Sequence, residues 1–147
     1  MRLTAFTDYC LRVLMYAGAK ESGLATIDEI AKSYGISRNH LMKVVFRLGQ
    51  LGYLETLRGK GGGMRLAMAP EQINIGRLVR ETEEDLSLVE CFLGRDQQCR
   101  IASVCILRGA LSEALAAFLG VLDGYTLADL LKPKRRLTQL LQISAPH

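Results

Sequence analysis

The chain has 147 residues, enough for a small domain with an added oligomerisation element, and 49% of them are apolar, which excludes a disordered polypeptide. No apolar run reaches the roughly 18 residues that cross a bilayer, and Arg2, Asp8 and Arg12 interrupt the N-terminus. We therefore expect a cytoplasmic protein without a signal peptide. Residues 1–65 hold ten Lys or Arg against five Asp or Glu, a balance that suits a nucleic-acid-binding module, although a solvated surface of lopsided charge would have the same composition.

Residues 6–17 have the apolar spacing of an amphipathic helix. Cys10 lies within the apolar stripe, so we expect it to be a small buried hydrophobic residue. Asp8 falls about 160° from the centre of that stripe, at about 100° per residue, and should point outward. Arg12 follows four residues later, so a surface ion pair is the simplest role for Asp8.

Two short helices joined by a tight turn at Gly35 come next and predict a helix-turn-helix. Thr26 begins a capping box for the first helix, and Ser37 caps the second. Met42 and Phe46 fall toward the outer side of the second helix, and the pattern gives no reason for apolar residues there. The other outward or flanking residues of the second helix are polar: Asn39, His40, Lys43, Arg47 and Gln50.

Residues 53–57 and 64–67 alternate as short strands should, with a basic, glycine-rich loop between them. This pattern predicts a β-hairpin with an extended tip, the wing of a winged helix. A phosphate-cradling nucleotide loop is the alternative, but the run lacks the Gly-Lys-Ser/Thr ending and the helix that would follow. The wing residues that could contact a phosphate or a minor groove are Arg58, Lys60, Gly61, Gly62 and Arg65.

Asn74 caps a further helix after Pro70, and a long helix begins at about Leu107. The apolar surface of the long helix exceeds what a small winged helix can cover, so it predicts a second subunit. Packing back onto its own domain is the alternative. A short helix should follow at residues 127–131.

Three cysteines, Cys91, Cys99 and Cys105, lie in one segment, separated by seven and five residues. This is not the short pair spacing of zinc knuckles, and no histidine lies nearby. Three thiolates in one loop suit soft metals, above all iron–sulfur clusters. Three unrelated buried cysteines are the alternative. A thiol oxidoreductase is not expected, because the chain has no Cys-x-x-Cys pair and no base accompanies a cysteine.

Several segments resemble the NsrR family of nitric-oxide-sensing, iron–sulfur winged-helix repressors. They are LTAFTDY at 3–9, YGISRNH at 34–40, RGKGGG at 58–63, LSLVEC at 86–91 and YTLADL at 125–130. The resemblance covers nearly the whole chain apart from the basic stretch after Leu131. It implies a mainly α fold with a small β-hairpin wing, in which a winged helix-turn-helix domain is followed by a long dimerisation helix.

The organisation that we predict has four parts. They are a DNA-binding domain at 1–70, a linking helix and cluster-binding loop at 71–106, a dimerisation helix with a short helix at 107–131, and a solvated basic tail at 132–147.

The resemblance also implies a ligand set for a four-iron–four-sulfur cluster, namely Cys91, Cys99 and Cys105 with Asp8 from the partner subunit. The seven-residue gap between Cys91 and Cys99 is longer than in many members of the family, which puts the loop shape in doubt. Arg108 stands where sister regulators of the IscR type have a histidine, which argues against their two-iron site as the alternative.

The function implied is that of a homodimeric repressor bound to double-stranded operator DNA and released when nitric oxide attacks the cluster. A metal-free thiol switch on a DNA-binding protein is the competing hypothesis. The residues predicted to bind DNA are Thr26, Ser37, Arg38, Asn39, His40, Lys43, Arg47, Arg58, Lys60, Gly61, Gly62 and Arg65.

Overall fold

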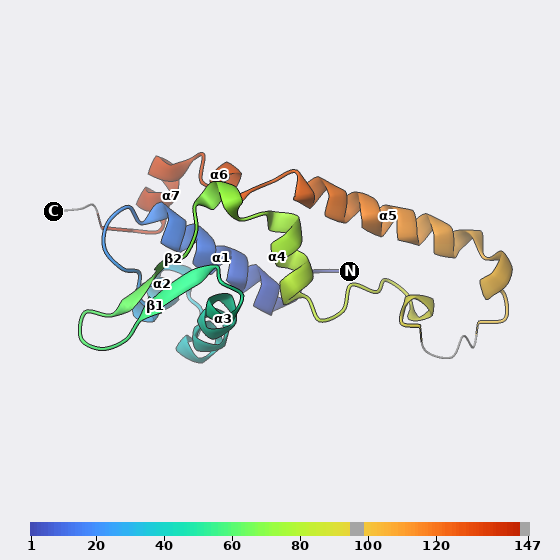
Figure 1. Ribbon diagram of the computed structural model, residues 1–147, viewed down its shortest axis with the longest axis horizontal. Helices are drawn as coiled ribbons and strands as arrows, with labels where there is room; N and C mark the ends of the chain where they lie inside the picture. The colour runs from blue at the N-terminus through green and yellow to red at the C-terminus, as the bar shows by residue number, and fades with distance from the viewer. Residues whose placement is uncertain (95–98, 145–147) are drawn as a thin grey trace.

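The computed structural model describes residues 1–94 and 99–144. Helices α1–α4 and the β1–β2 hairpin form a head, defined as residues 1–82 and 125–144, from which α5 projects within an arm, defined as residues 83–94 and 99–124 (Figure 1). The prediction of a mainly α fold with a small β-hairpin is confirmed. The helices are α1 (Ala5–Ala19), α2 (Ile27–Tyr34), α3 (Arg38–Gln50), α4 (Ile75–Thr82), α5 (Ile106–Asp123), α6 (Leu127–Leu130) and α7 (Lys134–Leu140); the strands are β1 (Leu54–Leu57) and β2 (Gly63–Leu66).

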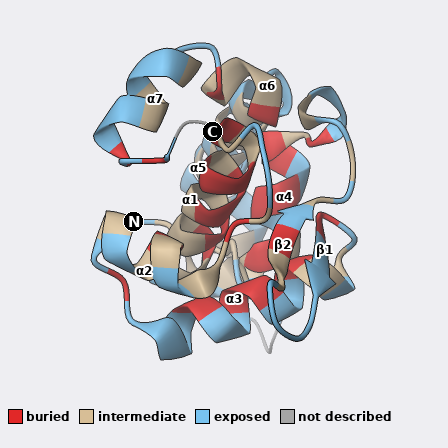
Figure 2. Cartoon of the chain, turned by 90° about the vertical axis from the view of Figure 1, so that its left-hand side faces the viewer, coloured by how far each residue is buried: buried red, intermediate tan, exposed pale blue. Residues whose placement is uncertain are grey.

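The core of the head is built around α1. Its residues Cys10, Val13 and Leu14 are completely buried and belong to the same cluster as Leu41 from α3 and Leu78 from α4. Figure 2 shows these buried surfaces of the helices turned toward one another, with exposed residues on the outside. The apolar spacing read from the sequence therefore does select the buried face of α1, and Cys10 is the buried hydrophobic residue that it predicts.

The helix-turn-helix begins and ends at the predicted caps. The Thr26 hydroxyl accepts a hydrogen bond from the Glu29 N–H at 3.2 Å, while the Glu29 carboxylate accepts the Thr26 N–H at 2.8 Å, which completes the capping box. α2 ends at Gly35, and the Ser37 hydroxyl accepts the N–H of His40 at 3.3 Å to start α3.

The wing is an antiparallel pair in which Leu54 lies opposite Leu66. Ala25 adds a bridge on the other side of β2. Its N–H donates to the Met64 carbonyl at 2.9 Å, and its carbonyl accepts the Met64 N–H at 2.7 Å. The tip turns through Gly61, whose φ of +76° is a conformation that other residues rarely adopt. The sequence did not predict the bridge, because it joins residues from two separate segments.

One contact between the arm and the head lies between α4 and the end of α5. Arg80 makes two contacts with the Asp123 carboxylate, at 2.5 and 2.8 Å, and the Asn74 amide donates to the Asp123 carbonyl at 2.7 Å. Gly76 faces Asp123 so closely that a side-chain carbon at this position would lie 2.8 Å from the Asp123 nitrogen. The absence of a side chain at Gly76 therefore permits the close approach of the two helices.

α5 differs from the other long helices because none of its 18 residues is buried. In Figure 1 it extends away from the head, and the segment that carries the cysteines lies at its far end. Although α5 is rich in apolar residues, none of the described helices is both long and apolar enough to cross a membrane.

The expectation of a solvated tail after residue 131 was wrong. α7 lies over the end of α1, and Leu141 and Ile143, which follow it, are 9% and 7% exposed and join the core. The Ser33 hydroxyl of α2 donates to the Leu141 carbonyl at 2.8 Å. The expectation rested on the basic residues and did not consider Leu141 and Ile143, the two apolar side chains that pack against the head.

Candidate nucleic-acid interface and metal-binding segment

The outer face of α3 is exposed and carries no acidic residue. Asn39, His40 and Lys43 are all exposed, and the His40 ring lies 6.0 Å from that of Tyr9, measured between centroids. The first two turns of a recognition helix are the part that reaches base edges in a major groove. This face therefore offers hydrogen-bonding side chains where DNA recognition would need them.

Some of the residues predicted to bind DNA already have partners in the head. Arg38 pairs with Asp28, Arg65 pairs with Glu55 at 2.8 Å, and Arg47 donates to the Glu81 carbonyl at 3.4 Å. Thr26 and Ser37 serve as helix caps. Within the described residues no salt bridge joins the exposed cations Lys43, Arg58 and Lys60 to a carboxylate, so these side chains are free to meet phosphates.

Three consecutive residues at the boundary between the head and the arm, Glu81, Thr82 and Glu83, form what we call the junction. Glu81 accepts hydrogen bonds from the Tyr53 hydroxyl at the base of the wing and from Arg77 Nε at 2.9 Å. Burial alone would raise the pKa of the Glu81 carboxyl, but the hydrogen bonds from Tyr53 and Arg77 outweigh it and hold the pKa below its ordinary value. Glu81 therefore remains ionised and ties α4 to β1.

The rest of the junction holds the start of α1. The buried hydroxyl of Thr7 donates to that of Thr82 at 3.0 Å, and Thr82 in turn donates to the Leu78 carbonyl at 2.9 Å. The Thr4 N–H donates to the Glu83 carboxylate at 2.8 Å. The sequence analysis missed the contacts of Thr7 with Thr82 and of Thr4 with Glu83, and no signal in the sequence marks them, because each spans more than 70 positions of the chain.

The three cysteines of the arm are free thiols in different positions. Cys91 lies in a short 3₁₀ turn and is partly buried, Cys99 is exposed, and Cys105 caps α5, where its sulfur accepts the Arg108 N–H at 3.4 Å. In the part of the chain that the structure describes, no three His, Cys, Asp or Glu side chains stand close enough together to hold a metal ion. The structure thus puts these thiols in one segment without joining them into a site.

These thiols suit a soft metal by their chemistry, and Cys10 does not. Burial raises the pKa of the Cys10 thiol to about 12, despite the opposing charge of Arg47, so Cys10 stays protonated inside the core. Cys91, Cys99 and Cys105 lie at or near the surface, where a thiol can lose its proton to a metal. Three sulfur donors in one exposed segment fit an iron–sulfur cluster that draws its remaining ligand from elsewhere.

Asp8 faces solvent, as its place in the helical pattern predicted. Its carboxylate is 2.9 Å from Arg12, and the two side chains are 46% and 41% exposed. The Arg12 guanidinium also lies 5.6 Å from the centre of the Tyr34 ring. Asp8 belongs to the head, whereas the cysteines lie at the far end of the arm (Figure 1). Asp8 and the cysteines are therefore carried by different parts of the chain.

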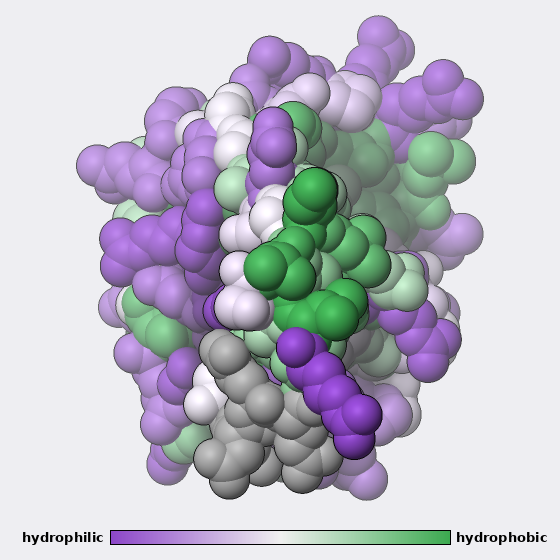
Figure 3. Space-filling model, turned by 90° about the vertical axis from the view of Figure 1, so that its right-hand side faces the viewer, coloured by the Kyte–Doolittle hydropathy of each residue, from purple (hydrophilic) through white to green (hydrophobic). Residues whose placement is uncertain are grey.

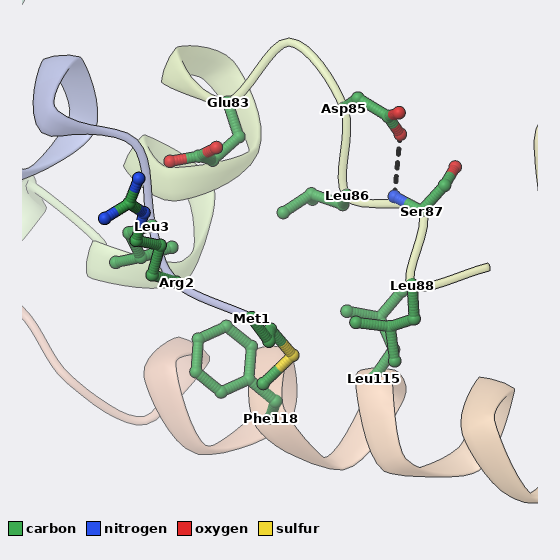
Figure 4. A pocket seen from close by; sticks show the side chains of 10 residues that line it. All are labelled: Met1, Arg2, Leu3, Glu83, Asp85, Leu86, Ser87, Leu88, Leu115 and Phe118. Atoms are coloured by element: carbon green, nitrogen blue, oxygen red, sulfur yellow. Dashed lines mark hydrogen bonds between the residues drawn. The ribbon is translucent and has the colours of Figure 1, made fainter.

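A cavity of about 440 Å³ separates the start of the chain from the arm. Met1, Arg2 and Leu3 form one wall, residues 83–88 a second, and Leu115 and Phe118 of α5 the third (Figure 4). Asp85 holds the chain in this region by accepting the N–H of Ser87 at 2.7 Å. The cavity is mostly apolar and open, so it resembles an incompletely packed surface more than a catalytic pocket.

The tip of the molecule carries a hydrophobic surface (Figure 3). Ile106 and Leu107 at the start of α5 are 88% and 64% exposed. Exposed apolar side chains in the preceding turn, Ile101 and Val104, extend it. Contiguous exposed apolar surface of this kind is typical of sites that bind another molecule.

Comparisons with known proteins agree with this geometry. A family model described as Rrf2, iron-dependent transcriptional regulator, matches residues 3–133. The HTH-type transcriptional regulator NsrR of Bacillus subtilis is 56% identical over 144 residues, covering 97% of this chain and 99% of that protein. NsrR of Geobacillus kaustophilus is 54% identical and covers 97% of each chain.

Solved structures share the architecture. CymR, the global cysteine regulator of B. subtilis, superposes with a TM-score of 0.71 at 26% identity and covers 88% of this chain and 95% of its own. The IscR of T. potens has a TM-score of 0.73 at 21% identity and covers 100% and 94% of the two chains, a likeness that concerns the fold alone.

Proposed function

The chain belongs to the Rrf2 family of transcriptional regulators, and from this premise we propose that it is a dimeric DNA-binding repressor that senses nitric oxide through an iron–sulfur cluster. Membership of this family confirms the resemblance found in the sequence, and it confirms that the protein is not an enzyme. One observation carries the proposal: an exposed recognition face on α3 and an exposed three-thiol segment lie on the same chain. A regulator of this kind acts where the DNA is, in the cytoplasm.

The DNA-binding part of the proposal is supported by α3 and the wing. In a dimer, two copies of α3 would enter successive major grooves of a near-palindromic operator, with Asn39, His40 and Lys43 facing base edges. Arg58 and Lys60 in the wing would lie over the phosphates beside the minor groove. Arg38, Arg47 and Arg65 would have to exchange an internal partner for a phosphate.

The sensor part is supported by the thiols and by the names of the relatives. Cys91, Cys99 and Cys105 would hold the cluster, and Asp8 of the partner would complete its ligands. We favour a four-iron–four-sulfur over a two-iron–two-sulfur cluster because Arg108 replaces the histidine of IscR-type regulators. When bound, the cluster would supply iron atoms with which nitric oxide reacts. Asp8 and the cysteines would then part, and the two α3 helices would lose their fixed spacing.

The dimer is supported by an exposed stripe on α5. Leu107, Ala110, Ala114, Ala117 and Val121 recur every three or four residues and are all exposed. Small residues at this spacing let two helices approach closely, and a second copy of the same helix presents the complementary surface.

The cluster is tested by comparing cysteine variants purified without oxygen. Cys99→Ala should lose most of its iron, and Asp8→Ala should fold normally but lose nitric-oxide control of DNA binding. Cys10→Ala is the matched control and should keep both iron and control, because Cys10 lies in the core. Iron and sulfide analysis, absorption spectra and DNA affinity with and without nitric oxide give the readouts. We expect a ten- to hundredfold loss of affinity with the gas, a coupling of about 2–3 kcal/mol. Unchanged affinity of iron-loaded protein would contradict the proposal.

The dimer is tested with one charge placed on either of two exposed alanines of α5. Ala114→Glu puts a carboxylate within the stripe, and Ala116→Glu puts it on the opposite face of the helix. We expect the first variant to become monomeric by light scattering and the second to remain a dimer. Equal behaviour of the two variants would place the subunit contact elsewhere.

A metal-free thiol switch is the second candidate, and the exposed free thiol of Cys99 favours it. It predicts colourless, iron-free protein whose DNA affinity responds to peroxide and not to nitric oxide. The same purification decides between the two functions.

A further inference from the structure

Two large apolar side chains on the outer face of α3 have no role in the core. Met42 is 54% exposed and Phe46 is 66% exposed. A face that is otherwise polar and basic gains nothing in stability from exposed apolar groups, so such groups point to a contact with another molecule.

The two residues face different surroundings. Phe46 lies in the third turn of α3 and lines a hollow together with Thr4 and Phe6. The rim of this hollow includes the carboxylates of Glu81 and of residues 83–85. Arg47 also lines the hollow, but the carboxylates outnumber it, so the hollow favours a phosphate less than the start of α3 does. Met42 lies one turn closer to the start of α3, beside Lys43 and three residues after Asn39. On the helix surface its neighbours toward the start of α3 are Arg38 and Asn39, and Phe46 follows one turn later.

We propose that Met42 is a specificity-determining residue that packs against the C5 methyl group of a thymine in the major groove. The inference rests on the proposed DNA-binding function and adds to it a base preference. Asn39 and Lys43 can satisfy the donors and acceptors of adenine and guanine. The thymine methyl is the apolar group that a base pair presents in this groove, and a long, polarisable methionine side chain can adapt its shape to cover it.

The size of the effect follows from the chemistry. Burying one methyl group in an apolar contact changes the affinity roughly three- to fivefold. Two half-sites in a dimer complex would raise this to about tenfold or more. Replacing thymine by uracil removes only that methyl group and leaves base pairing intact, so it isolates the contact.

The test uses the full-length protein purified without oxygen and a duplex that this protein selects from a pool of random-sequence DNA. Each thymine of the duplex is replaced by uracil in turn, and affinities are measured at one salt concentration. For the wild type, we expect one position in each half-site to lose three- to fivefold in affinity. Met42→Ala should bind the thymine duplex about tenfold or more weakly, because both subunits lose the contact, and it should not distinguish thymine from uracil at that position.

Phe46→Ala is the matched control, because it also removes an exposed apolar side chain from the same helix face. It should keep the full difference between thymine and uracil. Met42→Leu should retain most of it, which guards against a folding defect in the alanine variant.

The expected result is a position at which the wild type distinguishes thymine from uracil and Met42→Ala does not. The inference is overturned if no such position exists, or if Phe46→Ala removes the difference instead. A protein that selects no duplex over random DNA would overturn the proposed function, and this inference with it. Selective binding without methyl dependence would overturn the inference alone.

Discussion

Helices α1 to α4 of the head each place side chains in a shared core, whereas α5 of the arm buries none of its 18 residues. Both regions are rich in apolar residues, so composition does not separate them. The head uses its apolar residues for its own stability, and the arm leaves them available to another chain. A single polypeptide thus contains one part that buries its apolar side chains and one part that leaves them exposed.

The largest effect should come from deleting a core side chain of the head. Leu41 is completely buried between α3 and α1, so Leu41→Ala should lower the free energy of unfolding by about 3 kcal/mol, from lost burial and from the cavity left behind. Urea denaturation at fixed protein concentration measures it.

Leu107→Ala in the arm is the matched deletion, because Leu107 is 64% exposed. In an isolated chain it should change stability by less than about 0.5 kcal/mol. Any larger effect should depend on protein concentration, because it would act through the partner. If both variants lost the same free energy of unfolding at every protein concentration, the head and the arm would not differ in the way described.

An intermediate effect is expected at the junction, where the two regions meet. Tyr53→Phe removes the hydrogen bond to the ionised Glu81 and should cost about 1–2 kcal/mol near neutral pH. The pKa of Glu81 is lowered in the folded state, so its contribution is complete above the unfolded value of 4.5 and is lost as the pH falls through the lower folded value. The difference between wild type and variant should therefore shrink below about pH 4.5. A difference that stays constant down to acid pH would show that the carboxylate is not involved.

Lys134→Ala should have the smallest effect. Lys134 pairs with Glu21 at 3.0 Å on the surface of the head, and exposed pairs of this kind contribute less than about 0.5 kcal/mol. Thermal unfolding should hardly change, because Leu141 and Ile143 hold the C-terminal segment in place. A large loss would mean that charge, and not burial, attaches α7.

The sequence predicted those parts of the head that are specified locally. Thr26, Ser37 and Asn74 are caps whose hydrogen bonds reach only three residues along the chain, so their pattern is readable and correct. The stripe in α1 likewise follows from a 3.6-residue period. Both predictions needed no knowledge of the rest of the fold.

The parts that could not be predicted depend on distant residues. Ser33 forms a hydrogen bond with Leu141 across 108 positions, and Tyr53 forms one with Glu81 across 28. The residues around each partner in the sequence do not indicate these pairings. The basic residues around α7 suggested a solvated tail, while two apolar residues beyond them determined its packing. For the candidate cluster, the sequence names the thiols, but a ligand from a second chain leaves no pattern near them.

The close contact between Gly76 of α4 and Asp123 of α5 fixes the angle at which α5 leaves the head. Because Arg80 and Asn74 hold Asp123 where Gly76 lies against it, a tilt of α5 would strain its contacts with α4. Eighteen residues of helix span about 27 Å, so a rotation of about 5° at this contact would displace the far end by about 2 Å. In the opposite direction, a displacement of the far end of α5 would act on α4 through the same contacts.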